Sequence, residues 1–92
     1  MSEAKIAVVV GGSRGIGAAV VRLLAQAGYS VVFSYASNAA SAEAVAASVI
    51  SSGGHAIAIK ADSASEADLV SLFEQAQALG PIGALVYSAG IT

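Results

Sequence analysis

The chain has 92 residues, of which 57% are hydrophobic and 11% are charged, and its formal net charge is −2. This length allows one small domain. Because only four residues are Lys or Arg, no basic surface can follow nucleic-acid phosphates, and we exclude nucleic acid as a partner. The absence of cysteine excludes disulfides, thiolate catalysis and zinc–sulfur sites.

The high apolar content raises the question of a membrane protein. The longest wholly apolar run covers residues 6–10, whereas a membrane-spanning helix needs about 20 apolar residues. Residues 1–5 do not show the basic flank and long apolar region of a signal peptide. We therefore expect a cytoplasmic protein without membrane contact, whose excess apolar surface packs against more protein.

The first part of the chain alternates between strand-like and helix-like patterns. Residues 5–10 form a short run rich in β-branched side chains, which predicts a buried strand. A helix with one apolar face follows and ends at Gly28, where a C-terminal glycine belongs. Residues 29–35 predict a second strand. The predicted inward face of the first helix consists of Ile16, Val20, Leu23, Leu24 and Ala27.

The alternation continues to the end of the chain. Asn38 is a suitable N-cap for a second helix that runs to about Ser52, and residues 55–61 predict a third strand. A third helix stops at Gly80, and residues 84–88 predict a fourth strand. The second helix is expected to face inward with Ala42, Val45, Ala46, Val49 and Ile50, and the third helix with Leu69, Leu72, Phe73 and Ala76.

Two serines are candidate caps of the third helix. Ser63 stands three residues before Glu66, and Ser65 stands three residues before Asp68. Both spacings fit a capping box, although Asp is the weaker partner, so the choice between them stays open.

Strands that alternate with helices indicate an α/β fold with a parallel sheet and right-handed crossovers. The order βαβαβαβ corresponds to half of a Rossmann doubly wound fold, with helices on both faces of the sheet. We assign residues 1–92 to a single truncated domain of this kind.

A glycine-rich turn between the first strand and the first helix is the most informative motif. Gly11, Gly15 and Gly17 stand where a doubly wound sheet binds a dinucleotide pyrophosphate. Glycines allow the tight turn and let an anion approach the unpaired N–H groups at the helix N-terminus. A P-loop is excluded because Ala18 and Ala19 stand where its Lys and Ser/Thr belong.

The spacing Gly-x-x-x-Gly-x-Gly resembles the turn of the short-chain dehydrogenase/reductase family, and in detail that of 3-oxoacyl-acyl carrier protein reductases. The resemblance extends over residues 5–92 and includes the second strand with its loop (31–38), Asp62 after the third strand, and residues 80–82 and 87–90 around the fourth strand.

The resemblance implies a carbonyl/alcohol oxidoreductase with a sheet of order 3-2-1-4. This sequence departs from the family pattern at Val10, which replaces a threonine of the turn, and at Ser88, which replaces an asparagine. Gly83 stands where relatives usually have Asp.

The loop after the second strand bears on the choice of cofactor. NAD-preferring domains place Asp or Glu there to bind the ribose 2′-OH, but residues 35–38 contain no carboxylate. The resemblance implies that Arg14 can pair with a 2′-phosphate, and Ser37 and Asn38 can add donors. We therefore expect NADP(H) rather than NAD(H).

The cofactor site implied by the resemblance comprises residues of the glycine turn, the second-strand loop, the third-strand loop and the fourth-strand end. Asp62 is a contact to adenine or, equally, a cap of the third helix. No metal ligand is expected, since His55 has no second His or carboxylate cluster nearby. The expected cofactor-binding residues are Gly11, Ser13, Arg14, Gly15, Ile16, Gly17, Tyr35, Ser37, Asn38, Asp62, Ser63, Ser88, Ala89 and Gly90.

The family's catalytic serine and Tyr-x-x-x-Lys motif are not expected in these residues. The positions four after Tyr29, Tyr35 and Tyr87 are Phe, Ala and Ile, so we predict no catalytic residue and no activity of this chain alone. Three functions stay open: an NADP(H)-binding portion of a reductase, one piece of an enzyme completed by a separate C-terminal half, or a non-catalytic module. The module would self-associate through an exposed apolar fourth strand at the sheet edge.

Overall fold

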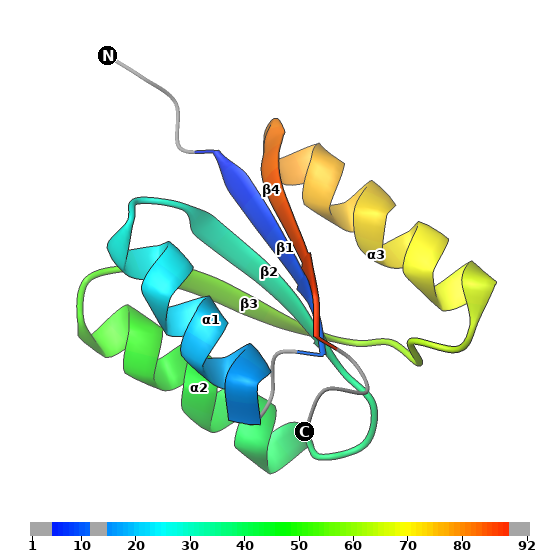
Figure 1. Ribbon diagram of the computed structural model, residues 1–92, viewed down its shortest axis with the longest axis horizontal. Coiled ribbons are helices and arrows are strands. Elements are labelled where there is room, and N and C mark those ends of the chain that lie inside the picture. Colours follow the sequence, from blue (N-terminus) through cyan, green and yellow to red (C-terminus); the bar gives the residue numbers. More distant parts are fainter. Residues whose placement is uncertain (1–4, 12–14, 89–92) are drawn as a thin grey trace.

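The computed structural model describes residues 5–11 and 15–88. Strands and helices alternate along the chain as predicted, and all four strands are parallel in the order β3-β2-β1-β4 (Figure 1). This confirms the α/β half-Rossmann architecture. The elements are β1 (Ile6–Val10), α1 (Gly15–Gln26), β2 (Ser30–Tyr35), α2 (Ala39–Ser51), β3 (His55–Lys60), α3 (Glu66–Leu79) and β4 (Ile82–Tyr87).

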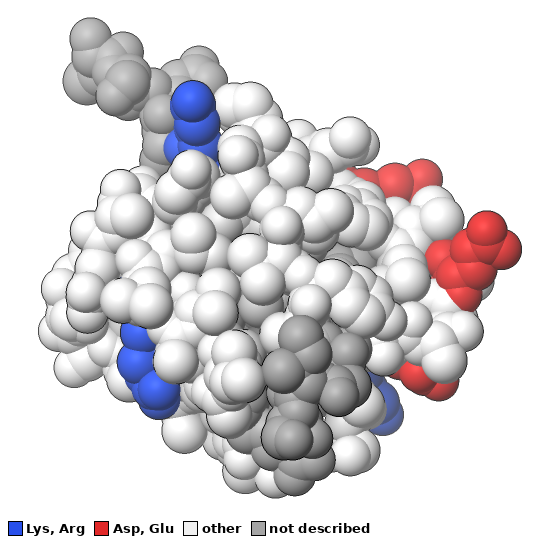
Figure 2. All heavy atoms as spheres, in the orientation of Figure 1, with Lys and Arg blue, Asp and Glu red and all other residues white. Residues whose placement is uncertain are grey.

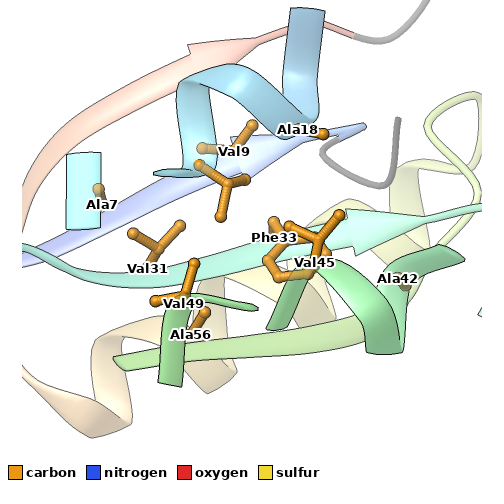
Figure 3. Packing of buried hydrophobic residues seen from close by; sticks show 10 residues of the cluster. Ala7, Val9, Ala18, Val31, Phe33, Ala42, Val45, Val49 and Ala56 are labelled. Carbon is orange, nitrogen blue, oxygen red and sulfur yellow. The ribbon is translucent and has the colours of Figure 1, made fainter. Parts of the chain in front are cut away.

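The helices cover the sheet unequally, with α1 and α2 on one face and α3 alone on the other (Figure 1). Every residue of β1 is buried, because this strand lies between β2 and β4 and has helices on both sides. Its side chains alternate, so that Val9 joins the cluster under α1 and α2 while Val8 joins the cluster under α3. Figure 3 shows Phe33 of β2 packed with Val45 of α2 in the first cluster.

The helix ends follow the sequence signals. The Asn38 side chain accepts a hydrogen bond from the Ser41 N–H at 3.0 Å, which confirms it as the N-cap of α2. For α3 the cap is Ser65, whose hydroxyl accepts from the Asp68 N–H at 3.3 Å, and not Ser63.

The predicted inward face of α1 is wrong in part. Gly17, Ala18 and Val21 face the sheet, whereas Ile16 and Leu23 are 54% and 63% exposed. The small side chains lie where the helix packs on the strands, a position that a count of large apolar residues does not reveal. Ile16 and Leu23 therefore lie on the side of α1 that is turned away from the sheet.

Two further large apolar side chains are exposed, and Ile50 is one that was predicted to face inward. Ile50 is 59% exposed because the buried stripe of α2 ends with Val49, one residue earlier. Ile57 of β3 is 46% exposed, since the cluster under α3 is centred on β1 and β2. The predicted inward residues Leu72 and Ala76 of α3 are fully buried. None of the described helices is long and apolar enough to cross a membrane.

Candidate dinucleotide-binding site

The candidate site lies at the carboxyl edge of the sheet, where the parallel strands end together. The register pairs Val10 with Tyr87 and Tyr35 with Lys60, so the loops that follow all four strands leave the same edge. The chain continues from β1 to β2 in one direction across the sheet, while β4 returns to the other side of β1. Doubly wound folds bind ligands outside the sheet at this reversal of strand order.

The glycine turn has the geometry that an anion site requires. Gly11 and Gly15 have φ angles of +88° and +63°, which glycine adopts without a side-chain penalty. Apart from its chain neighbours and its own helix backbone, a Cβ built on Gly15 would meet no atom of the described residues within 4 Å, so the space beside Gly15 is open. That first turn contains no acidic residue, and the positive end of the helix dipole is available to a phosphate.

Two buried serines from the neighbouring strands hold this turn. The Gly11 N–H donates to the Ser34 hydroxyl at 2.9 Å. The Ser88 hydroxyl reaches the carbonyl oxygens of Val10 and Gly11 at 3.1 and 2.8 Å, and the Ser88 N–H donates to the Val10 carbonyl at 2.9 Å. The substitution of Ser for the family's asparagine at position 88 thus preserves a hydrogen-bonding side chain against the turn.

Ser34 is a site residue that the sequence analysis missed. It is a polar residue, 1% exposed, in a strand whose three preceding residues, 31–33, are apolar and buried. Burying a hydroxyl is costly unless it is hydrogen-bonded, so a serine directly after three buried apolar residues of a strand was the available signal.

The loop after β2 contains the residues expected to distinguish the two nicotinamide cofactors. Tyr35 is partly buried, while Ser37 and Asn38 are exposed. The hydrogen bond from the Ser41 N–H uses the Asn38 side-chain oxygen, whereas the amide nitrogen is the atom that can donate to a phosphate.

The loop after β3 is held by a set of hydrogen bonds around Asp62. Its N–H donates to the Asp68 carboxylate at 2.8 Å, and its own carboxylate accepts from the Ala64 N–H at 2.9 Å. The Ser65 N–H donates to the Asp62 carbonyl at 2.9 Å. Asp62 is exposed and is not the N-cap of α3, so the cap alternative is removed. The partly buried Ser63 lies in the same loop.

Only some of the expected cofactor-binding residues lie in the described part of the chain. Gly15, Ile16 and Gly17 form the first turn of α1, with Gly17 buried, and Gly11 directly follows β1. Ser88 lies directly across from the turn. The expected contacts Ser13, Arg14, Ala89 and Gly90 lie outside the described residues.

The charged side chains at this edge lie on the β3 side, where Lys60 ends the strand and Asp62 contacts Asp68 of α3. On the face shown in Figure 2 the visible acidic side chains lie on the side of α3 and the loop before it, while Glu43 belongs to α2. In residues 5–11 and 15–88, no group of three His, Asp or Glu side chains comes close enough to hold a metal ion. Since the first turn of α1 has no acidic residue, an anion there would meet backbone N–H groups and no carboxylate of that turn.

Comparison with known proteins agrees with this geometry. Residues 5–92 match the short chain dehydrogenase family, and the chain belongs to that family. It is 41% identical over 90 residues to a 3-oxoacyl-[acyl-carrier-protein] reductase of Synechocystis, an alignment that covers 97% of this chain and 36% of the reductase.

Two solved structures show the same fold. A short-chain dehydrogenase/reductase from Serratia marcescens is 51% identical with a TM-score of 0.87, over 90% of this chain and 34% of that one. A blue fluorescent protein from a metagenomic library, in complex with NADPH, is 45% identical with a TM-score of 0.82, over 88% of this chain and 34% of that one. The chain thus spans about one third of the length of these relatives.

Proposed function

We propose that these 92 residues form the NADP(H)-binding portion of a short-chain dehydrogenase/reductase that interconverts a carbonyl group and an alcohol. The observation that supports this most strongly is the glycine turn, which opens onto the N-terminus of α1 and is held by Ser34 and Ser88. The NADPH complex of the related blue fluorescent protein supports the choice of cofactor class.

Each part of the edge has a proposed role. The N–H groups at the start of α1, beside Gly15, bind the pyrophosphate. Arg14, Ser37 and Asn38 bind the 2′-phosphate, and the loop of Asp62 and Ser63 contacts the adenine. Ser88, together with residues 89–90, contacts the cofactor beyond the end of β4. The bound nicotinamide would supply or accept the hydride.

We also propose that this portion does not catalyse the reaction by itself. No tyrosine in the sequence is followed four residues later by lysine, so the proton-transfer group of the family is not among these residues. Residues of a further segment or of a separate chain would have to supply it. Reductase activity that appears when the chain is mixed with a family C-terminal half would support this division of roles.

Calorimetric titration of the 92-residue chain with NADPH and NADH tests the cofactor assignment. NADPH should bind more tightly, and Arg14→Ala should remove most of the difference because a charge-assisted hydrogen bond contributes roughly 1.5–3 kcal/mol. Arg22→Ala is the matched control, because Arg22 lies on the α2 side of α1 with its Nε 3.3 Å from the Ser48 hydroxyl. Equal affinity for both cofactors would refute the NADP(H) preference.

A second candidate function, self-association, rests on the surface around β4. In the described part of the chain β4 pairs only with β1, so its outer N–H and C=O groups form an open sheet edge. On the α3 face of this strand Leu85 and Tyr87 are 57% and 55% exposed.

We propose that a second copy of the chain pairs with this edge when no other segment covers it. Leu85→Lys should lower the apparent mass in sedimentation experiments, because a charge on an apolar edge opposes pairing. Ile57→Lys is the control, since Ile57 is 46% exposed on the same face at the opposite edge of the sheet. A monomeric parent chain would refute self-association.

A further inference from the structure

Ser34 and the glycine turn are linked by a hydrogen bond across 23 residues of sequence. The Ser34 hydroxyl lies 2.9 Å from the Gly11 nitrogen, and the Ser34 side chain is 1% exposed. Gly11 is the first residue after β1 and has the φ angle of +88° that starts the turn. The bond therefore acts on the backbone at the point where the chain leaves the strand.

The residue before the turn cannot provide this support itself. Position 10 is valine, whose side chain has no hydrogen-bonding group. The neighbouring strands supply two hydroxyls instead: Ser34 of β2 accepts from the N–H of Gly11, and Ser88 after β4 bonds its carbonyl. The N–H and C=O groups of Gly11, the first residue of the turn, are thus both hydrogen-bonded to serine hydroxyls.

This arrangement also decides which amides are left for a ligand. The Gly11 N–H points to Ser34 inside the protein, so it serves as an anchor and not as a phosphate donor. The donors for an anion then come from the N-terminus of α1, where Gly15 faces open space. The position of that helix end relative to the sheet depends on the path of the turn.

We propose that Ser34 is a positioning residue for pyrophosphate binding: its hydroxyl fixes the Gly11 N–H and thereby holds the glycine turn in the form that presents the N-terminus of α1 to the ligand. This rests on the proposed cofactor site. Without the hydroxyl, the partly buried Gly11 N–H loses its partner, which is unfavourable, and the turn moves to find another.

The test compares Ser34→Ala with Val32→Ala in the full chain. Val32 is also 1% exposed and lies on the same face of β2, so its truncation disturbs the packing without touching the turn. Affinities are measured for NADPH and for adenosine 2′-monophosphate, which lacks the pyrophosphate. Ser34→Ala should weaken NADPH roughly fivefold and leave adenosine 2′-monophosphate unchanged, while Val32→Ala should change neither.

Hydrogen exchange at the Gly11 amide gives a readout that needs no cofactor. Exchange should accelerate at least about tenfold in Ser34→Ala, and it should accelerate no more in Val32→Ala than at the neighbouring β1 amides. If the parent chain does not bind NADPH, the proposed function fails, while the exchange rate still tests the anchor. Unchanged exchange in Ser34→Ala, or equal weakening of both ligands, would overturn the assignment.

Discussion

Replacement of Gly15 by alanine tests the glycine turn with a single methyl group. At the φ angle of +63° found for Gly15, a Cβ costs roughly 1–2 kcal/mol of strain. Apart from its chain neighbours and its own helix backbone, the methyl would meet no atom of the described residues within 4 Å, so no steric clash with them adds to this cost. Gly15→Ala should therefore lower the free energy of unfolding by about that amount and leave the chain folded.

The same methyl group would project into the space that we assign to the pyrophosphate. If it displaces one charge-assisted hydrogen bond to the phosphate, the loss of roughly 1.5–3 kcal/mol corresponds to an affinity lower by about 10- to 150-fold. The effect on NADPH binding should thus exceed what the loss of stability explains.

Gly53→Ala is the matched control for this comparison. Gly53 follows α2 at the other end of the sheet, has a φ angle of +92° and also faces open space, so its substitution carries a similar strain without approaching the turn. Thermal unfolding and calorimetric titration should show that both variants lose stability but only Gly15→Ala loses NADPH affinity. Unchanged affinity in Gly15→Ala, or an equal loss in Gly53→Ala, would refute the reasoning.

Three further substitutions test other parts of the account. Asn38→Asp keeps an N-cap oxygen for α2, so the helix content measured by circular dichroism should not change. The added negative charge should weaken NADPH binding in titrations and leave NADH binding at least as tight as in the parent chain. Unchanged NADPH binding would contradict the role of this loop. Asp68→Ala removes the acceptor of the Asp62 N–H and should lower the free energy of unfolding, measured by thermal unfolding, by about 1 kcal/mol. Asp68→Asn keeps a side-chain acceptor, so its free energy of unfolding should be closer to that of the parent chain. Leu72→Ala, at a side chain with 0% exposure, should cost about 2–5 kcal/mol in denaturant unfolding, whereas Val70→Ala, at 52% exposure, should stay within about 0.5 kcal/mol.

The order of elements could be predicted because each signal is local. A short β-branched run predicted β1, and Asn38 predicted the start of α2 through its own side chain. The face of α1 could not be predicted in the same way. The periodic rule favours large apolar residues, but Gly17 and Ala18 face the sheet and Leu23 does not.

In the candidate site, too, the features set by local sequence could be predicted and those set by contacts between distant segments could not. The glycines of the turn were predictable, because their spacing in the sequence reflects a local backbone requirement. The roles of Ser34 and Asp68 were not, because each acts through a hydrogen bond to the backbone of another segment, and no pattern of neighbouring residues encodes that contact. The open question about Asp62 was resolved in part for the same reason, once Ser65 was found at the cap of α3.

The central claim is that NADPH binds at the carboxyl edge of this sheet, with its pyrophosphate on the glycine turn. Titration of the isotopically labelled chain with NADPH, followed by the amide signals in NMR spectra, tests it most directly. The account predicts shifts at Gly11, Gly15 and Asp62 and none at Gly54 and Gly80, which lie at the opposite, amino edge before β3 and β4. Shifts confined to that amino edge, or no shifts at saturating NADPH, would contradict it.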